Sequence, residues 1–206
     1  MKKKKGVVLG ICMLSIGILF GFSLYLYNGT KLDYSDNEYD YIIDPIIDTY
    51  IPVVGESNVI VKPYVSDKVS IKVNYYDYKS SEENQKNSLI YYENTYLQNS
   101  GVVYGSDTDF DVVSVLDGTV VEVKEDSALN QIVTIRHSNE LLSVYQGLKD
   151  VTLKVNDIVN TGTIIGKSST SNMLKDYKST LLFEMIFNGN NVNPEDYYNK
   201  SLEELS

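Results

Sequence analysis

The chain has 206 residues, with 18 lysine and arginine residues against 28 aspartate and glutamate residues, one histidine and one cysteine. This length accommodates one sizeable domain with an appendage and leaves no room for a second large domain. The acidic balance disfavours nucleic-acid binding, and the single cysteine, Cys12, excludes both an intramolecular disulfide and a site built from several thiolates.

The N-terminal end combines a basic flank with a long apolar run. Lys2–Lys5 precede the uncharged run Val7–Tyr27, which as a helix would be roughly 31 Å long, enough to cross the hydrocarbon core. We predict a single-pass membrane helix at residues 7–27, with residues 1–6 in the cytoplasm and the rest of the chain outside. A cleaved signal peptide is the alternative, but the run is longer than usual and no small-x-small cleavage pattern follows it.

Two segments separate this helix from the main domain in the prediction. Residues 28–51 are acidic and rich in tyrosine, show no regular periodicity, and are expected to form a stalk. Residues 52–98 are expected to form a β segment packed on the core, because 58–64 and 69–78 alternate apolar and polar residues. Residues 79–87 are predicted to be a polar loop.

From residue 110 onward the sequence alternates short apolar runs with turn residues such as Asp-Gly, Thr-Gly and Asn-Gly. No long amphipathic helix is evident, and only 174–177 and 195–205 are candidates for helix. The fold class is therefore predicted to be mainly β. The predicted strands are Val112–Val115, Thr119–Lys124, Ile132–His137, Leu141–Tyr145, Thr163–Gly166 and Leu181–Phe187.

A set of short motifs follows in fixed order between residues 99 and 198: DGTVVEV, IVTIRH, SVYQGL, VNDIVNTGTIIGK, LLFEMIFNG and VNPEDYY. Together they resemble the LytM, or lysostaphin-type, zinc endopeptidase family, whose members cut peptidoglycan cross-bridges. The resemblance implies a LytM-like antiparallel β domain at residues 99–198. Members of that family hold zinc through an HxxxD motif and the second histidine of HxH. The first histidine of HxH and a histidine in YxHL assist catalysis.

Every metal-binding and catalytic position that this resemblance implies is occupied by an unsuitable residue. A catalytic zinc ion needs three protein ligands, and valine and leucine side chains donate nothing to a metal. The sequence therefore predicts no metal, no cofactor and no hydrolase activity. The degenerate positions are Asn99 and Val103 for HxxxD, Thr180 and Leu182 for HxH, and Gly147 for the YxHL histidine.

The only histidine, His137, ends a predicted strand. We interpret it as hydrogen bonded to a neighbour, because a histidine at this point of the resembled family lies outside the catalytic set. The alternative from the enzyme class is an unorthodox zinc endopeptidase that uses His137 and two carboxylates. No local spacing supports such a site.

A longer resemblance extends from about residue 51 to residue 198. The basic start, the apolar helix and the segments NYYDYK, SLIYYENTYLQNSGV and TGTIIGKSS resemble the stage II sporulation protein Q family of endospore formers. This resemblance implies a forespore membrane protein that faces the intermembrane space and acts in engulfment and in an intermembrane channel. It also implies a heteromeric complex, with ring formation left open, with a partner like stage III sporulation protein AH. The alternative is a protein that binds peptidoglycan or regulates an amidase.

The residues alone favour the same broad function, a tethered binding module, since tethering raises the effective concentration of a partner. Strand edges are candidates for pairing with a partner's sheet, but the sequence does not identify the binding face. The candidate contact segments are Phe187–Asn191 and Lys124–Asn130, with Leu129 as an anchor. Residues 199–206 are predicted to be a C-terminal tail.

Overall fold

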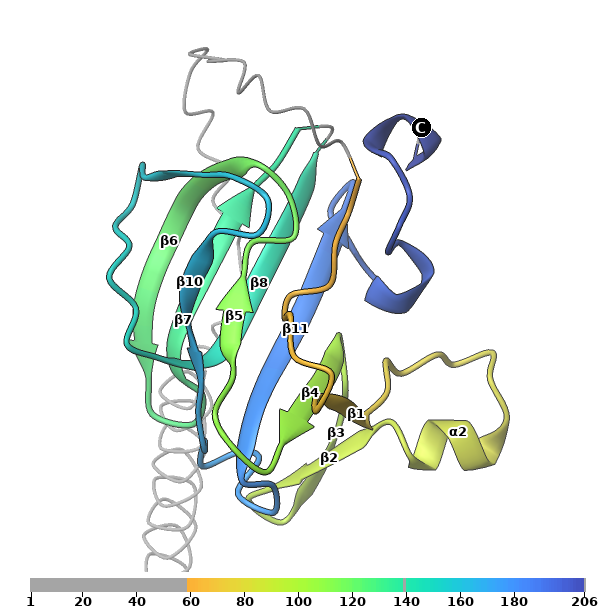
Figure 1. The fold of residues 1–206 in the computed structure, drawn as a ribbon. Helices are drawn as coiled ribbons and strands as arrows, with labels where there is room; N and C mark the ends of the chain where they lie inside the picture. Colours follow the sequence, from red (N-terminus) through yellow and green to blue (C-terminus); the bar gives the residue numbers. More distant parts are fainter. Residues whose placement is uncertain (1–58, 139, 206) are drawn as a thin grey trace, which may run out of the picture. The chain divides into compact units, whose positions relative to one another are not determined.

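The computed structural model describes residues 59–138 and 140–205 (Figure 1). The predicted cytoplasmic end, membrane helix and stalk lie outside these residues, as do residues 52–58 of the predicted β segment. In the part of the chain that is described, none of the helices has the length and apolar character needed to cross a membrane.

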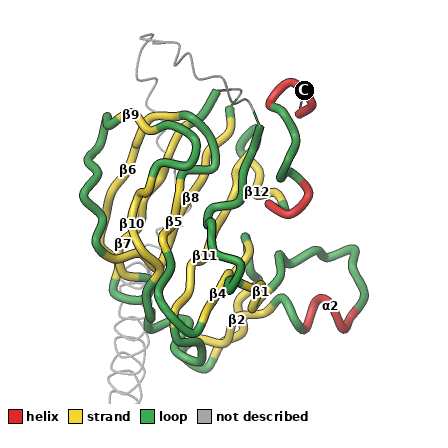
Figure 2. Tube along the Cα trace, viewed as in Figure 1, coloured by secondary structure: helices red, strands yellow, loops and turns green. Residues whose placement is uncertain are grey.

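A ten-stranded sheet, in which all pairings are antiparallel, forms the body of the described part. Its main path runs β1-β4-β11-β8-β7-β6-β9, and β5, β10 and β12 pair beside this path. The prediction of a mainly β fold is confirmed (Figure 2). The strands are β1 Ser70–Val73, β4 Val102–Ser106, β5 Asp111–Val113, β6 Gly118–Asp126, β7 Asn130–Arg136, β8 Leu141–Lys149, β9 Ile158–Val159, β10 Ile164–Ser168, β11 Ser179–Phe187 and β12 Asn190–Val192.

A separate hairpin, β2 (Leu89–Tyr92) and β3 (Thr95–Gln98), follows the short helix α2 (Glu82–Lys86). The prediction of a polar loop at residues 79–87 was therefore wrong in part. The helix forms because Ser81 caps it, its Oγ accepting from Asn84 N at 3.3 Å, while acidic residues occupy the first turn and Lys86 the last.

Two predicted strands before residue 80 are shorter than expected. Residues 59–64 make only isolated bridges at Val59 and Tyr64, partly because Pro63 has no N–H to donate. Within 69–78 only β1 is regular, since its pairing with β4 shifts register between Ile71 and Val73. All six strands predicted beyond residue 110 are confirmed, with ends that differ by a few residues.

The two candidate helices near the C-terminal end were also wrong. Residues 174–177 form turns, and residues 195–205 contain the short 3-10 helices η1 (Pro194–Asp196) and η2 (Leu202–Leu205). In both regions the local main-chain bonds join residues three apart, as in Tyr177 N to Leu174 O at 3.0 Å. Such bonds close single turns and do not propagate an α-helix.

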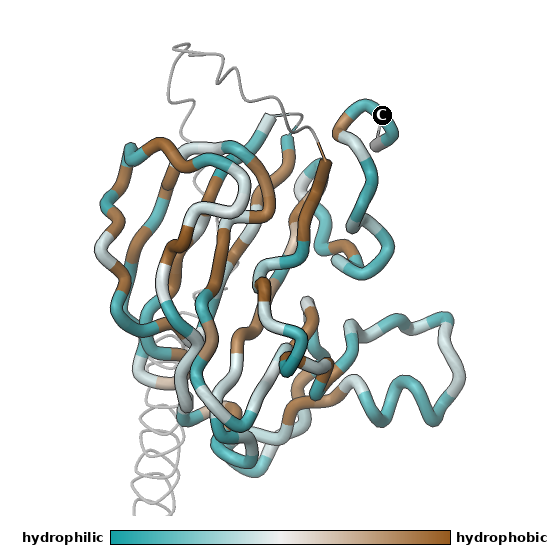
Figure 3. The backbone as a smooth tube through the Cα atoms, viewed as in Figure 1, coloured by the Kyte–Doolittle hydropathy of each residue, from teal (hydrophilic) through white to brown (hydrophobic). Residues whose placement is uncertain are grey.

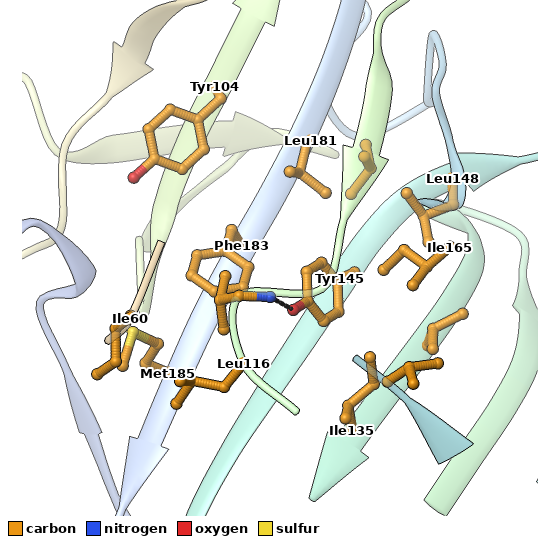
Figure 4. Close-up of a cluster of buried hydrophobic side chains, with 14 of the residues drawn as sticks. Ile60, Tyr104, Leu116, Ile135, Tyr145, Leu148, Ile165, Leu181, Phe183 and Met185 are labelled. Atoms are coloured by element: carbon orange, nitrogen blue, oxygen red, sulfur yellow. Dashed lines mark hydrogen bonds between the residues drawn. The ribbon is translucent and has the colours of Figure 1, made fainter. Parts of the chain in front are cut away.

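The first core lies on the face of the sheet over which β5 and β10 curl (Figure 1). Tyr145 and Phe183 are fully buried at its centre with ring centroids 5.0 Å apart. The Tyr145 hydroxyl accepts a hydrogen bond from Val115 N at 3.0 Å, so its polar end is satisfied (Figure 4). The side chains labelled in Figure 4 are Ile60, Tyr104, Leu116, Ile135, Tyr145, Leu148, Ile165, Leu181, Phe183 and Met185.

A second core lies on the opposite face of the same strands. Successive side chains of a strand point to opposite faces, so Leu181 and Phe183 enter the first core while Leu182 enters the second. Apolar residues therefore recur along the strands, whereas the loop that contains α2 is polar (Figure 3). The second core consists of Val73, Ile90, Val103, Leu129, Ile132, Val144, Leu174, Leu182 and Ile186.

Candidate functional site

The fold brings four of the five degenerate positions to one patch of the sheet. Val103 on β4 is the register partner of Leu182 on β11. Leu182 also lies opposite Gln146 on β8, the neighbour of Gly147. A Cβ atom added at Gly147 would lie 3.1 Å from the carbonyl oxygen of Thr180. These residues share one region of the sheet, as the residues of a single site would.

The side chains at the centre of this patch pack as core residues. Val103 is fully buried and Leu182 is 5% exposed. Ile90 of the β2–β3 hairpin, Leu129 of the β6–β7 turn and Leu174 of a later turn belong to the same second core. Segments from three parts of the chain therefore cover the face on which the resemblance places the metal.

Asn99, the fifth position, holds the covering hairpin in place. Its Nδ2 donates to the carbonyl oxygens of Val73 at 3.3 Å and Asn74 at 2.9 Å, and its Oδ1 accepts from Gly101 N at 3.3 Å. The residue is 1% exposed, so these bonds satisfy an amide that would otherwise be costly to bury. Its main chain adds bonds from Asn99 N to Ser88 O at 3.1 Å and from Tyr76 N to Asn99 O at 2.9 Å.

Thr180 and Gly147 join a second hydrogen-bond network at the edge of the patch. Thr180 N donates to Ser169 O at 2.9 Å, and Ser169 Oγ donates to Gly147 O at 2.8 Å. Asn130 Nδ2 donates to Ser169 Oγ at 2.7 Å. Gly147 has a φ of 86°, a backbone conformation that disfavours histidine or any other residue with a Cβ atom.

Glu184 is the carboxylate on the same face of β11, two residues beyond Leu182. Burial raises the pKa of Glu184, while hydrogen bonds from Ser100 and Gln146 act in the opposite direction. Among residues 59–138 and 140–205, no group of three or more histidine, cysteine, aspartate or glutamate side chains could hold a metal ion.

His137 lies elsewhere, at the end of β7, and is 6% exposed. Its Nδ1 lies 2.9 Å from Asp117 O and its Nε2 lies 2.7 Å from Ser143 Oγ, which confirms the predicted hydrogen-bonded histidine. Ser143 precedes Gly147 by four residues on β8, or roughly 13 Å along the strand. Burial lowers the pKa of His137 to about 4, so the ring is neutral at pH 7.

The predicted contact segments differ in what they expose. Leu129 is only 9% exposed and belongs to the second core, so its prediction as a surface anchor was wrong. The loop turns inward because Asp126 Oδ1 accepts from both Ala128 N and Leu129 N at 2.8 Å. Residues 188–190 at the tip of the β11–β12 hairpin are exposed.

The outer edge of β6 is largely unpaired in the described part of the chain. Strand β9 pairs with β6 only at Gly118 and Thr119, and the Asn156–Asp157 segment bonds Val120. From Glu122 onward the register partners of β6 lie on β7, and Val121 lies at the irregularity between Val120 and Glu122.

Comparisons with known proteins agree with this geometry. The peptidase family M23 model matches residues 97–194. Over 156 residues the chain is 31% identical to stage II sporulation protein Q of Bacillus subtilis strain 168, covering 74% of this chain and 55% of that protein. The chain thus spans about half the length of this curated relative.

Solved structures extend the similarity to three dimensions. A structure of the SpoIIQ–SpoIIIAH pore-forming complex matches with 30% identity and a TM-score of 0.69, covering 72% of this chain and 97% of that chain. A crystal structure of the SpoIIIAH and SpoIIQ complex matches with 31% identity and a TM-score of 0.64, covering 67% and 99%. A zinc-containing peptidase from Vibrio cholerae shares the fold at 16% identity and a TM-score of 0.52, covering 65% of this chain and 38% of that chain.

Proposed function

Because this chain belongs to the stage II sporulation protein Q family, we propose that it is a non-catalytic binding module that docks a SpoIIIAH-like partner during endospore formation. The predicted helix at residues 7–27 anchors it in the forespore membrane, with the basic end in the cytoplasm. The described domain then faces the intermembrane space, where the pair acts in engulfment and in a channel between the two cells.

The observation that supports this proposal most directly is the burial of the patch around Val103 and Leu182. An M23 peptidase needs metal ligands on an open groove, whereas these two side chains are buried beneath Ile90, Leu129 and Leu174. The same buried state disfavours the alternative in which this patch holds peptidoglycan. What remains for binding is the outer surface of the domain.

We place the docking surface at the outer edge of β6. An unpaired strand edge offers main-chain donors and acceptors to a strand from another protein. Among the described residues, Glu122–Glu125 pair only with β7, Val121 lies at the irregularity where this edge begins, and the nearby Ile158 is 56% exposed. With partner and module each tethered to a membrane, a modest affinity is sufficient.

The test is capture of a SpoIIIAH-like ectodomain by the full-length chain in nanodiscs. We expect saturable binding that Val121→Lys weakens about tenfold, which corresponds to about 1.4 kcal/mol. Ile164→Lys is the matched control, because Ile164 is also apolar and is 58% exposed but lies on β10. Equal weakening of binding by both variants would contradict docking at the edge of β6. Absence of capture by the unmodified chain would contradict the proposed binding of a SpoIIIAH-like partner.

Two further measurements address the alternatives. Binding of the full-length chain to purified peptidoglycan sacculi, without capture of the protein partner, would favour a wall-binding or amidase-regulating function. Stoichiometric zinc that a chelator removes, together with cleavage of muropeptides, would establish an unorthodox endopeptidase and overturn the non-catalytic assignment.

A further inference from the structure

The first described residues are held between two segments that are distant in the sequence. Val59–Tyr64 lies beside Asn199–Ser201 on one side and Val112–Val115 on the other. We call Val59–Tyr64 and Asn199–Leu202 together the clasp. Its main-chain bonds are Ile60 N to Lys200 O at 3.0 Å, Asn199 N to Ile60 O at 2.9 Å, Val61 N to Val115 O at 3.0 Å and Val113 N to Pro63 O at 3.0 Å.

Buried side chains reinforce these bonds from both halves of the clasp. Ile60 is fully buried and Leu202 is 7% exposed, and both belong to the first core. The segment predicted as a C-terminal tail therefore contributes a core residue.

Polar contacts also stabilise the clasp and the residues beside it. Tyr104 Oη donates to Glu195 Oε1 at 2.5 Å and lies 2.8 Å from Tyr198 Oη. Lys62 Nζ lies 5.8 Å from the ring centroid of Tyr64 and 5.9 Å from that of Tyr198, within the range of cation–π attraction. The segment Val59–Tyr64 thus contacts both the sheet and the C-terminal residues from Tyr198 to Ser201.

The position of the clasp along the chain determines which mechanical force acts on it. Everything upstream of residue 59, including the predicted membrane helix, joins the described domain through this segment. If a partner in an opposite membrane binds the sheet, any separation of the membranes loads the chain at residue 59. This step rests on the proposed function.

The geometry suits such a load. Bonds of an antiparallel pair run across the strands, and the bridges of Val59 to Ser201 and of Tyr64 to Val112 are both antiparallel. Tension along Val59–Tyr64 therefore acts across several bonds together, and it must also extract Ile60 from the core. We propose that the clasp is the structure that resists tension between the membrane anchor and the binding domain.

The test is single-molecule pulling on the full-length chain in a detergent micelle, with Cys12→Ser removing the native thiol. One pair of handles, Lys5→Cys and Lys124→Cys, places the clasp in the load path. A second pair, Lys124→Cys and Lys178→Cys, leaves it outside. Both lysines of the second pair are solvent-exposed, with side-chain exposures of 49% and 74%.

With handles at residues 5 and 124, Leu202→Ala should lower the force at which the first rupture occurs. With handles at residues 124 and 178, the same substitution should leave that force nearly unchanged. The first rupture with the first pair should release residues 59–69, since β1 begins at Ser70, and lengthen the molecule by up to roughly 40 Å. A chain that ends after Tyr198 should show the same behaviour more strongly. Leu97→Ala is the control, because Leu97 lies in the hairpin and is 37% exposed.

Equal loss of force with both pairs of handles would show that Leu202 supports only overall stability, and would overturn the proposal. Unchanged force with both pairs would overturn it as well. These outcomes are distinguishable from failure of the proposed function, because failure of partner capture would leave the pulling result unaffected.

Discussion

The two faces of β11 show how one strand separates folding from chemistry. Leu181, Phe183 and Met185 enter the first core and are fully buried. Thr180 and Leu182, on the other face, occupy the positions at which the resemblance to zinc peptidases implies a catalytic histidine and a zinc ligand, respectively. The first face packs the main core, and the second face is packed with apolar side chains where the resemblance implies a metal site.

The difference lies in what covers each face. The first core contains residues of β5 and β10, which belong to the sheet itself, together with Ile60 and Leu202 of the clasp. The second core is closed by a hairpin and two turns, which contribute Ile90, Leu129 and Leu174. Loops cover the second face, so this face can be either open or filled without a change in the sheet. One fold can therefore serve either as an enzyme or as a binding module.

The largest expected effect comes from introducing the zinc ligands and the catalytic histidine that the resemblance implies. The variant Asn99→His, Val103→Asp, Thr180→His, Leu182→His buries unpaired polar and charged groups, and should lose more than about 4 kcal/mol of unfolding free energy without metal. Zinc should restore much of this loss in a titration followed by thermal unfolding. A folded variant that gains no zinc affinity would contradict the alignment of these positions.

Truncation of the two neighbouring side chains compares the faces directly. Phe183→Ala should cost about 4 kcal/mol and Leu182→Ala about 3 kcal/mol in urea unfolding of the full-length chain. A loss below about 0.5 kcal/mol for Leu182→Ala, as at a surface position, would mean that the second face is an open groove. Tyr96→Ala serves as the surface control, since Tyr96 is 68% exposed.

Acid should lower the free energy of unfolding through His137, which lies on the first face of the sheet. The pKa of this buried ring is about 4 in the folded chain against 6.5 as the ordinary value, so below pH 6.5 the unfolded chain takes up a proton that the folded chain does not. Stability contributed by neutral His137 is therefore lost as pH falls from 6.5 to 4, by about 3 kcal/mol in total. His137→Gln should remove this component from the pH dependence measured by urea unfolding, and an unchanged slope would contradict it.

The smallest effect concerns the attachment of the hairpin. Asn99→Ala removes the side-chain bonds to Val73 O, Asn74 O and Gly101 N and should cost about 2 kcal/mol. Amide exchange should become faster in Leu89–Gln98 and stay unchanged in β7. Gln98→Ala is the matched control, because Gln98 also carries an amide but is exposed on β3, and equal acceleration by both variants would argue against a specific tie at Asn99.

Prediction from sequence succeeded where a pattern is local. Alternation and turn pairs located six strands beyond residue 110, because the period of a strand is visible in its own residues. The short strands β9 and β12 were not predicted, since two or three residues are too few to show a period. Strand β4 was missed since its five residues are all buried, which removes the alternation. The clasp pairs Ile60 with Lys200, and no local pattern connects residues so far apart.

By itself the sequence indicated the fold class, the family and the inability of Val103 and Leu182 to bind a metal, because strand periodicity, motifs and ligand capacity are properties of the residues themselves. Only the tertiary structure decided that Leu129 is buried, that His137 bonds to Ser143, and that Asn99 ties a hairpin over the patch. These outcomes depend on where loops from distant parts of the chain come to rest. Contacts of that kind are set by packing of the whole domain, and no single stretch of sequence contains them.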